Sequence, residues 1–139
     1  MSRTDELLWA EDRGWRELSD LVRRVRSDDL EVSGDGAGGW TVKDLMWHVA
    51  RWSAEAIETL EQIWAGTYDG GHDSWDTTDE RNARWLEESR RLDLVTVKAA
   101  WYATRTIMVE TFGSLPDPTP DAIEWFEEKI GRASCRERV

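Results

Sequence analysis

The segment from Gly38 to Trp52 combines a helix start with an apolar stripe, and it constrains the fold more than any other part of the chain. Beyond this start, apolar residues recur at steps of three and four, and His48 shares their register. The apolar positions are Leu45, Val49, Trp52, Ala56, Leu60 and Ile63. This period is that of one face of an α-helix, so His48 is expected to point inward.

The start of this helix is well specified by its first residues. Thr41 can accept a hydrogen bond from a first-turn amide, and Asp44 favours the exposed N–H groups of that turn. Trp40 is expected to pack on Leu45 as a hydrophobic staple. The sequence therefore predicts a helix that begins after Thr41 and ends near Ala65.

Similar patterns predict helices on both sides of this one. The first is expected to start near Thr4, a plausible cap, and to run to about Arg26. The segment Asp76–Arg91 reads as a short, mostly exposed helix with Trp85 and Leu86 as its main apolar anchors. Asp93 can cap a further long helix. The stripe of that helix consists of Leu94, Val97, Trp101, Met108 and Phe112.

Three prolines, Pro116, Pro118 and Pro120, end this helical region. Thr119 followed by Pro120 is a typical helix start, so a last helix containing Trp125 is predicted. No segment shows the alternation of a β-strand. We therefore expect an all-α, up-and-down four-helix bundle whose last helix is incomplete.

Composition limits the partners that the chain can bind. Its 139 residues suit one domain, and the single Cys135 allows no internal disulfide. The N-terminus does not resemble a signal peptide, and no apolar run approaches the roughly 20 residues that cross a bilayer. A net charge of −11 repels phosphate backbones and anionic lipids. These features predict a cytoplasmic protein that binds neither nucleic acid nor a membrane.

Three segments carry a resemblance to a known superfamily: GWTVKDLMWHVARW, ERNARWLEESRRLDL and LPDPTPDAIEWFEE. They resemble the DinB-like four-helix bundles, and within them the proteins grouped with mycothiol-dependent maleylpyruvate isomerases. The similarity extends from Trp9 to Glu128. It implies a pocket between the helices in which a divalent metal, often zinc or nickel, activates a thiol or a water molecule. In the mycothiol-dependent proteins, the thiol belongs to that cofactor.

The resemblance implies that His48 is a metal ligand, because it matches the histidine that the family carries on its second helix. The family supplies two more ligands from a His-x-x-x-His or Glu-x-x-x-His pair on the last helix. Two ligands four residues apart share one helix face, and a third from a facing helix leaves a coordination position open. No histidine follows His72 in this chain, so the pair is missing from it.

The final segment, KIGRASCRERV, explains this absence in our interpretation. It corresponds codon by codon to one reading frame of a common sequencing adapter. We therefore expect residues 130–139, from Ile130 to Val139, to be a non-native tail, and residues 1–129 to be a truncated bundle domain. The chain itself is then predicted to be inactive, since one imidazole does not complete a metal site.

Several interpretations remain open at this point. The leading one is a fragment of a metal-dependent enzyme that acts on a small molecule, a mycothiol-dependent or other thiol-dependent transferase or isomerase. The alternatives are a metal-dependent hydrolase or detoxification protein of the same superfamily, and a metal-free bundle that binds a small ligand or forms a homodimer. His48 can also be a core histidine that hydrogen-bonds a backbone carbonyl or a carboxylate. Asn82 is either a pocket contact or a surface residue, and His72 is expected to be solvated.

Overall fold

The computed structural model describes the chain apart from Met1 and four longer stretches. The described residues are 2–33, 39–68, 78–115 and 123–124. Within them the helices are α1 (Arg3–Arg24), α2 (Val42–Ala65), α3 (Thr78–Arg91) and α4 (Leu94–Gly113), and a short 3-10 turn spans Ser27–Asp29. These residues contain no strand, so the all-α prediction is confirmed for them.

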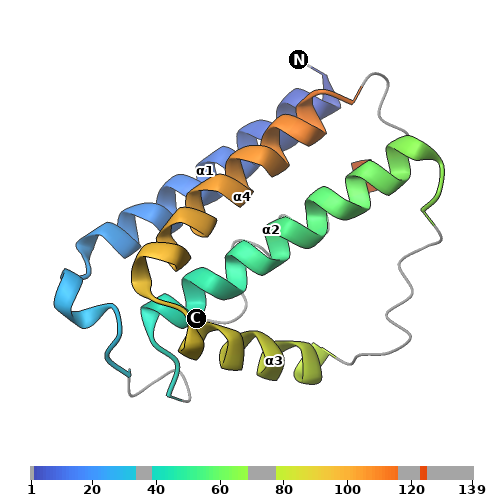
Figure 1. Cartoon of the computed structure of the whole chain (residues 1–139). Coiled ribbons are helices and arrows are strands. Elements are labelled where there is room, and N and C mark those ends of the chain that lie inside the picture. Colours follow the sequence, from blue (N-terminus) through green and yellow to red (C-terminus); the bar gives the residue numbers. More distant parts are fainter. Residues whose placement is uncertain (1, 34–38, 69–77, 116–122, 125–139) are drawn as a thin grey trace.

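Two apolar clusters show how the long helices are arranged. One joins the start of α1 to the ends of α2 and α4: Leu7, Ala56, Leu60, Met108 and Phe112. The other joins the end of α1 to the starts of α2 and α4: Trp15, Leu18, Met46, Val49, Val97 and Trp101. Helices α2 and α4 therefore run in the same direction and α1 runs opposite to both (Figure 1). Together with α3, which runs back along the first half of α2, this is the predicted up-and-down order.

The helix starts follow from their capping residues. Thr41 Oγ1 accepts a hydrogen bond from Asp44 N at 3.0 Å, and Asp44 Oδ2 accepts one from Thr41 N at 2.9 Å, as the sequence predicts. At α1 the cap is Ser2 and not Thr4, because Ser2 and Asp5 form the same reciprocal pair of bonds. Asp93 caps α4 by accepting a hydrogen bond from Thr96 N at 2.8 Å. Hydrogen bonding to the Thr96 side chain, together with this backbone bond, holds the pKa of Asp93 below its ordinary value.

Helix α3 differs from its prediction as a mostly exposed helix. Arg81, Trp85 and Ser89 are all buried, and they lie four residues apart on the face that packs against α2. The many charged residues of this segment predict an exposed helix, but one of those charges, on Arg81, is buried. Helix α3 is therefore an integral layer of the bundle.

The expected last helix lies almost entirely outside the described residues. Residues 123–124 have helical backbone, and Ile123 packs against the cluster around Leu60 and Phe112. Trp125, His72 and the segment 130–139 are not among the described residues. Of the helices that are described, none has the length and apolar character to span a bilayer.

Candidate functional site

His48 lies at the centre of a cluster of tryptophans between α2 and α3. Its side chain is buried, with 3% of the residue exposed. The rings of Trp40, Trp52 and Trp85 surround it edge-to-face, with centroids at 5.7, 6.2 and 5.5 Å from the imidazole. We call these three residues and His48 the tryptophan cluster. The prediction that His48 points inward is confirmed.

The imidazole of His48 accepts a hydrogen bond within the tryptophan cluster. Trp52 Nε1 donates to His48 Nε2 at 3.0 Å, from one turn further along α2. A ring nitrogen that accepts a hydrogen bond carries no proton, so the His48 ring is neutral and its proton is on Nδ1. Among the described residues, an indole N–H group is therefore one hydrogen-bond partner of the imidazole.

Two arginines stack on the tryptophan cluster. The guanidinium of Arg81 lies 5.5 Å from the Trp52 ring centre and 5.9 Å from that of Trp85, and Arg51 lies 5.5 Å from Trp85. Arg81 is only 5% exposed, and Glu55 of α2 pairs with it at 3.3 Å. Cation–π contacts and an ion pair together compensate for the burial of this charge.

Polar contacts on both sides of the tryptophan cluster connect α3 to α2. Ser89 Oγ donates to Asp44 Oδ1 at 2.7 Å inside the protein. Glu88 accepts a hydrogen bond from Trp47 Nε1 at 3.3 Å and pairs with Arg51 at 3.4 Å. Together with the Arg81–Glu55 pair, which precedes Trp85 along α3, these contacts fix Trp85 beside His48.

Asn82 and Trp85 carry polar atoms that the described residues leave without a hydrogen bond. Asn82 Oδ1 and Trp85 Nε1 are both buried, and neither has a partner within the part of the chain that the structure describes. The Asn82 residue itself is half-buried on α3. Its role as a pocket contact stays a prediction.

The described residues do not by themselves fit a bound metal ion. No group of three histidine, cysteine or acidic residues among them is placed to hold one. Of the three ligands that the family resemblance implies, only His48 is present there, and its Nε2 lone pair is occupied by the Trp52 N–H group. Its ring neighbours are tryptophans, which offer no metal-binding lone pair.

Comparison with known protein families identifies the chain. The model for the mycothiol maleylpyruvate isomerase N-terminal domain matches residues 12–134, which is most of the chain. The chain belongs to this family. Neither a comparison with curated proteins nor one with solved structures gave a match. The DinB-like resemblance on which His48 was selected is thereby confirmed, while its role as a ligand stays a prediction.

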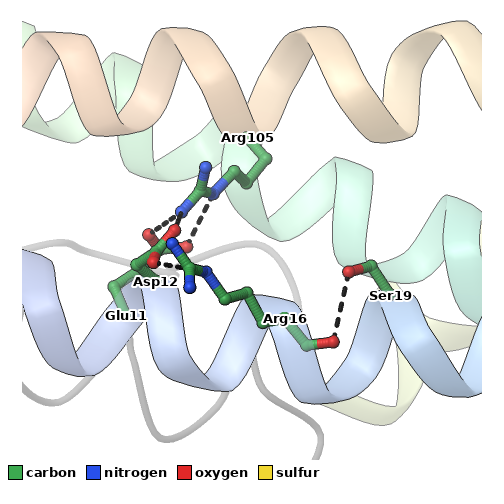
Figure 2. Close-up of polar contacts among 5 residues, drawn as sticks. All are labelled: Glu11, Asp12, Arg16, Ser19 and Arg105. Atoms are coloured by element: carbon green, nitrogen blue, oxygen red, sulfur yellow. Dashed lines mark hydrogen bonds and ion pairs between the residues drawn. The ribbon is translucent and has the colours of Figure 1, made fainter.

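The chain also contains a buried ion pair that its sequence did not predict. Arg105 of α4 donates to both carboxylate oxygens of Glu11 of α1, at 2.9 and 2.7 Å, and also contacts Asp12 at 3.2 Å (Figure 2). The guanidinium lies 5.2 Å from the Trp15 ring centre. Since 94 residues separate Glu11 from Arg105, no local pattern could reveal this pair.

Burial affects the pKa values of the two members of this ion pair differently. It raises the pKa of Glu11 above the ordinary value, and the hydrogen bonds and charge of Arg105 offset only part of this effect. Burial also opposes the charge of Arg105, but the hydrogen bonds and charges of Glu11 and Asp12 raise its pKa overall. The pair joins α1 to α4, whereas His48, Trp52 and Trp85 of the tryptophan cluster lie on α2 and α3, and we assign the pair a structural role.

Proposed function

We propose that His48 is the first ligand of a divalent metal ion, zinc or nickel, in a cytoplasmic enzyme of this family. The enzyme would act on a small-molecule substrate as a transferase or isomerase, with mycothiol or another thiol as cofactor. One observation carries the proposal beyond family membership: the buried His48 ring is neutral and presents Nε2 as an acceptor. Metal-bound histidines have this same form, with a neutral ring and a ring-nitrogen lone pair directed at the cation.

In this proposal, the surrounding residues prepare His48 for its role. The Trp52 N–H group occupies the Nε2 lone pair in the structure, so a metal ion would replace that donor. The rings of Trp40 and Trp85 cover the imidazole and keep water from it. The Arg81–Glu55 pair holds α3 against α2 and keeps the Trp85 ring in place.

The 139-residue chain is expected to be inactive as it stands. One imidazole competes poorly with water for a divalent ion, since catalytic zinc sites use about three protein ligands. We propose that residues 1–129 are the bundle domain and that a full ligand set requires a last helix carrying the histidine pair. The chain should therefore bind zinc weakly.

Calorimetric titration with Zn²⁺ and Ni²⁺ tests the ligand assignment. We expect weak binding to the chain, loss of that binding in His48→Ala, and tighter binding in Trp52→Phe because the competing N–H donor is removed. His72→Ala is the control and should titrate like the unsubstituted chain. Binding that survives in His48→Ala would contradict the proposal, and so would tight zinc binding by the chain together with ordinary cooperative melting.

The thiol requirement is tested in a version of the protein that includes a last helix with a histidine pair. Turnover that depends on added mycothiol supports the transferase or isomerase. Turnover of the same protein without any thiol would instead favour the metal-dependent hydrolase. Absence of stoichiometric metal from this longer protein would leave only a metal-free binding function.

A further inference from the structure

A chain of side-chain contacts connects His48 to Glu55 by way of α3. Trp52 Nε1 donates to His48 Nε2 at 3.0 Å, and the Arg81 guanidinium lies 5.5 Å from the Trp52 ring centre. Arg81 Nη1 in turn donates to Glu55 Oε2 at 3.3 Å. His48, Trp52 and Glu55 are spaced by four and three residues on one face of α2, and Arg81 comes from α3. Helix α3 therefore acts on His48 through Trp52 as well as through Trp85.

The guanidinium of Arg81 lies beside two perpendicular rings. The Trp52 and Trp85 rings have centroids 5.3 Å apart and an angle of 86° between their planes, and Arg81 lies 5.5 and 5.9 Å from the two ring centres. The Arg81 side chain is 7% exposed, so its ring contacts are desolvated and stronger than those at a surface. A Trp52 ring that turned away from His48 would lose contact with a buried charge.

The direction of the Trp52 ring decides which nitrogen of His48 carries the proton. An indole N–H group can only donate, so the Nε2 atom that it contacts must be unprotonated and the proton must be on Nδ1. The hydrogen bond at one imidazole nitrogen thus selects the tautomer. If the Trp52 N–H group pointed elsewhere, Nε2 could carry the proton itself.

We propose that Arg81 is a positioning residue for His48. It holds the Trp52 N–H group on Nε2 and thereby keeps the imidazole proton on Nδ1. Only the consequence for metal binding rests on the proposed function, in which Nε2 is the ligand atom, because the hydrogen bond is present in the chain without metal. Arg51 is the natural comparison: it lies 5.5 Å from the Trp85 ring centre, its side chain is 34% exposed, and its described contacts do not include Trp52.

NMR of the ¹⁵N-labelled imidazole in the metal-free chain tests the proposal. His72→Ala serves as the background, because it leaves His48 as the only histidine. At about pH 8, where a histidine of ordinary pKa is neutral, we expect a single Nδ1–H tautomer. Adding Arg81→Met should give a mixture of the two tautomers, and the Trp52 indole proton should exchange with solvent about tenfold faster because its hydrogen bond is weakened.

Two control variants separate this role from a general loosening of α3. Arg51→Met removes a cation from the Trp85 ring without touching Trp52, and Ser89→Ala removes a hydrogen bond between α3 and α2 at another point. Both should keep the single Nδ1–H tautomer and the slow exchange of the Trp52 indole proton. Near-ultraviolet circular dichroism checks that each variant is folded. The same changes in either control as in Arg81→Met would overturn the proposal.

Glu55→Gln keeps Arg81 in the chain but removes the charge that holds its guanidinium, so it should change both signals in the same direction. A single Nδ1–H tautomer in folded Arg81→Met would overturn the proposal, and the same result in Glu55→Gln would do so if Arg81→Met did not fold. The zinc titration is independent of these signals. Zinc binding lost in His48→Ala together with an unchanged tautomer would reject the role of Arg81 alone, and the opposite pattern would reject the ligand assignment alone.

Discussion

Trp52 donates its indole N–H to Nε2 of His48 at 3.0 Å, and both side chains are buried. This bond satisfies two polar atoms in the interior of the bundle. It also occupies the lone pair that a metal ion would need, so indole bonding and metal binding at Nε2 exclude each other. In the proposed enzyme, the Trp52 side chain would have to move away from His48 Nε2 when the metal is bound.

The first prediction concerns the stability that this bond provides. Trp52→Phe keeps an aromatic ring but leaves His48 Nε2 buried without its donor, so the free energy of unfolding should fall by about 1–3 kcal/mol. Urea denaturation at neutral pH measures it. The control is Trp9→Phe, at a residue that is 61% exposed, which should change stability little. Equal losses in the two variants would show that the bond contributes nothing.

The second prediction concerns the ion pair between α1 and α4. Arg105→Met leaves the Glu11 carboxylate buried without its counter-charge, and we expect a loss of about 2–4 kcal/mol at neutral pH. This is somewhat less than for a fully buried pair because the Arg105 side chain is 17% exposed. Arg16→Met is the control, since Arg16 is exposed and contacts Asp12 at the surface. A loss no larger than that of the control would contradict the buried-pair interpretation.

The pH dependence of this variant follows from the raised pKa of Glu11. A carboxyl whose pKa is higher in the folded than in the unfolded protein binds more protons when folded, so stability falls as pH rises through the folded pKa. In Arg105→Met the pKa of Glu11 should rise further, while Asp12 keeps its contact with Arg16. The stability lost at neutral pH should therefore return on acidification toward the ordinary value of 4.5, and Glu11→Gln in the same background should remove this pH dependence.

The sequence predicted those features that depend on neighbouring residues. The reciprocal bonds of Thr41 and Asp44 need only three-residue spacing, and the inward position of His48 follows from the period of its helix. The pairing of Glu11 with Arg105 depends instead on how α1 and α4 pack. The sequence could not predict the hydrogen bond between Trp52 and His48 for a different reason. The two residues are neighbours on one helix, but the side-chain direction of Trp52 decides whether its N–H group reaches the imidazole.

Arg81 shows why charge patterns can mislead. Arg81, Trp85 and Ser89 are spaced four residues apart in a segment rich in arginine and glutamate. This spacing is equally compatible with an exposed helix face and with a buried one. Burial of Arg81 becomes favourable because the folded protein places Glu55 and two tryptophan rings beside its guanidinium.

The third prediction tests this buried arginine. Arg81→Leu removes the ion pair with Glu55 and both ring contacts, so stability should fall by about 2–3 kcal/mol and the amides of α3 should exchange faster with solvent. Hydrogen exchange monitored by mass spectrometry measures the local effect. Arg90→Leu is the control at an exposed position of α3. If α3 exchange is the same in both variants, Arg81 does not hold this helix on α2.

The fourth prediction separates two functions of Asp44. Its Oδ2 caps α2 through Thr41 N, and its Oδ1 accepts the Ser89 hydrogen bond from α3. Asp44→Ala should cost about 2–3 kcal/mol, and Ser89→Ala about 1 kcal/mol, because only the cross-helix bond is lost. Asp93→Ala is the matched control, since Asp93 caps α4 from an exposed position, and it should cost about 1 kcal/mol.

A double-mutant cycle measures how much the Asp44–Ser89 hydrogen bond contributes to the free energy of unfolding. If the bond contributes, the Asp44→Ala and Ser89→Ala effects should be less than additive by about 1 kcal/mol in urea denaturation. The same cycle between Asp93→Ala and Ser89→Ala should be additive, because the structure records no bond between these two side chains among its described contacts. Additivity in the first cycle would mean that the other contacts between α3 and α2, such as those of Arg81 and Glu88, hold the helix without a contribution from Ser89.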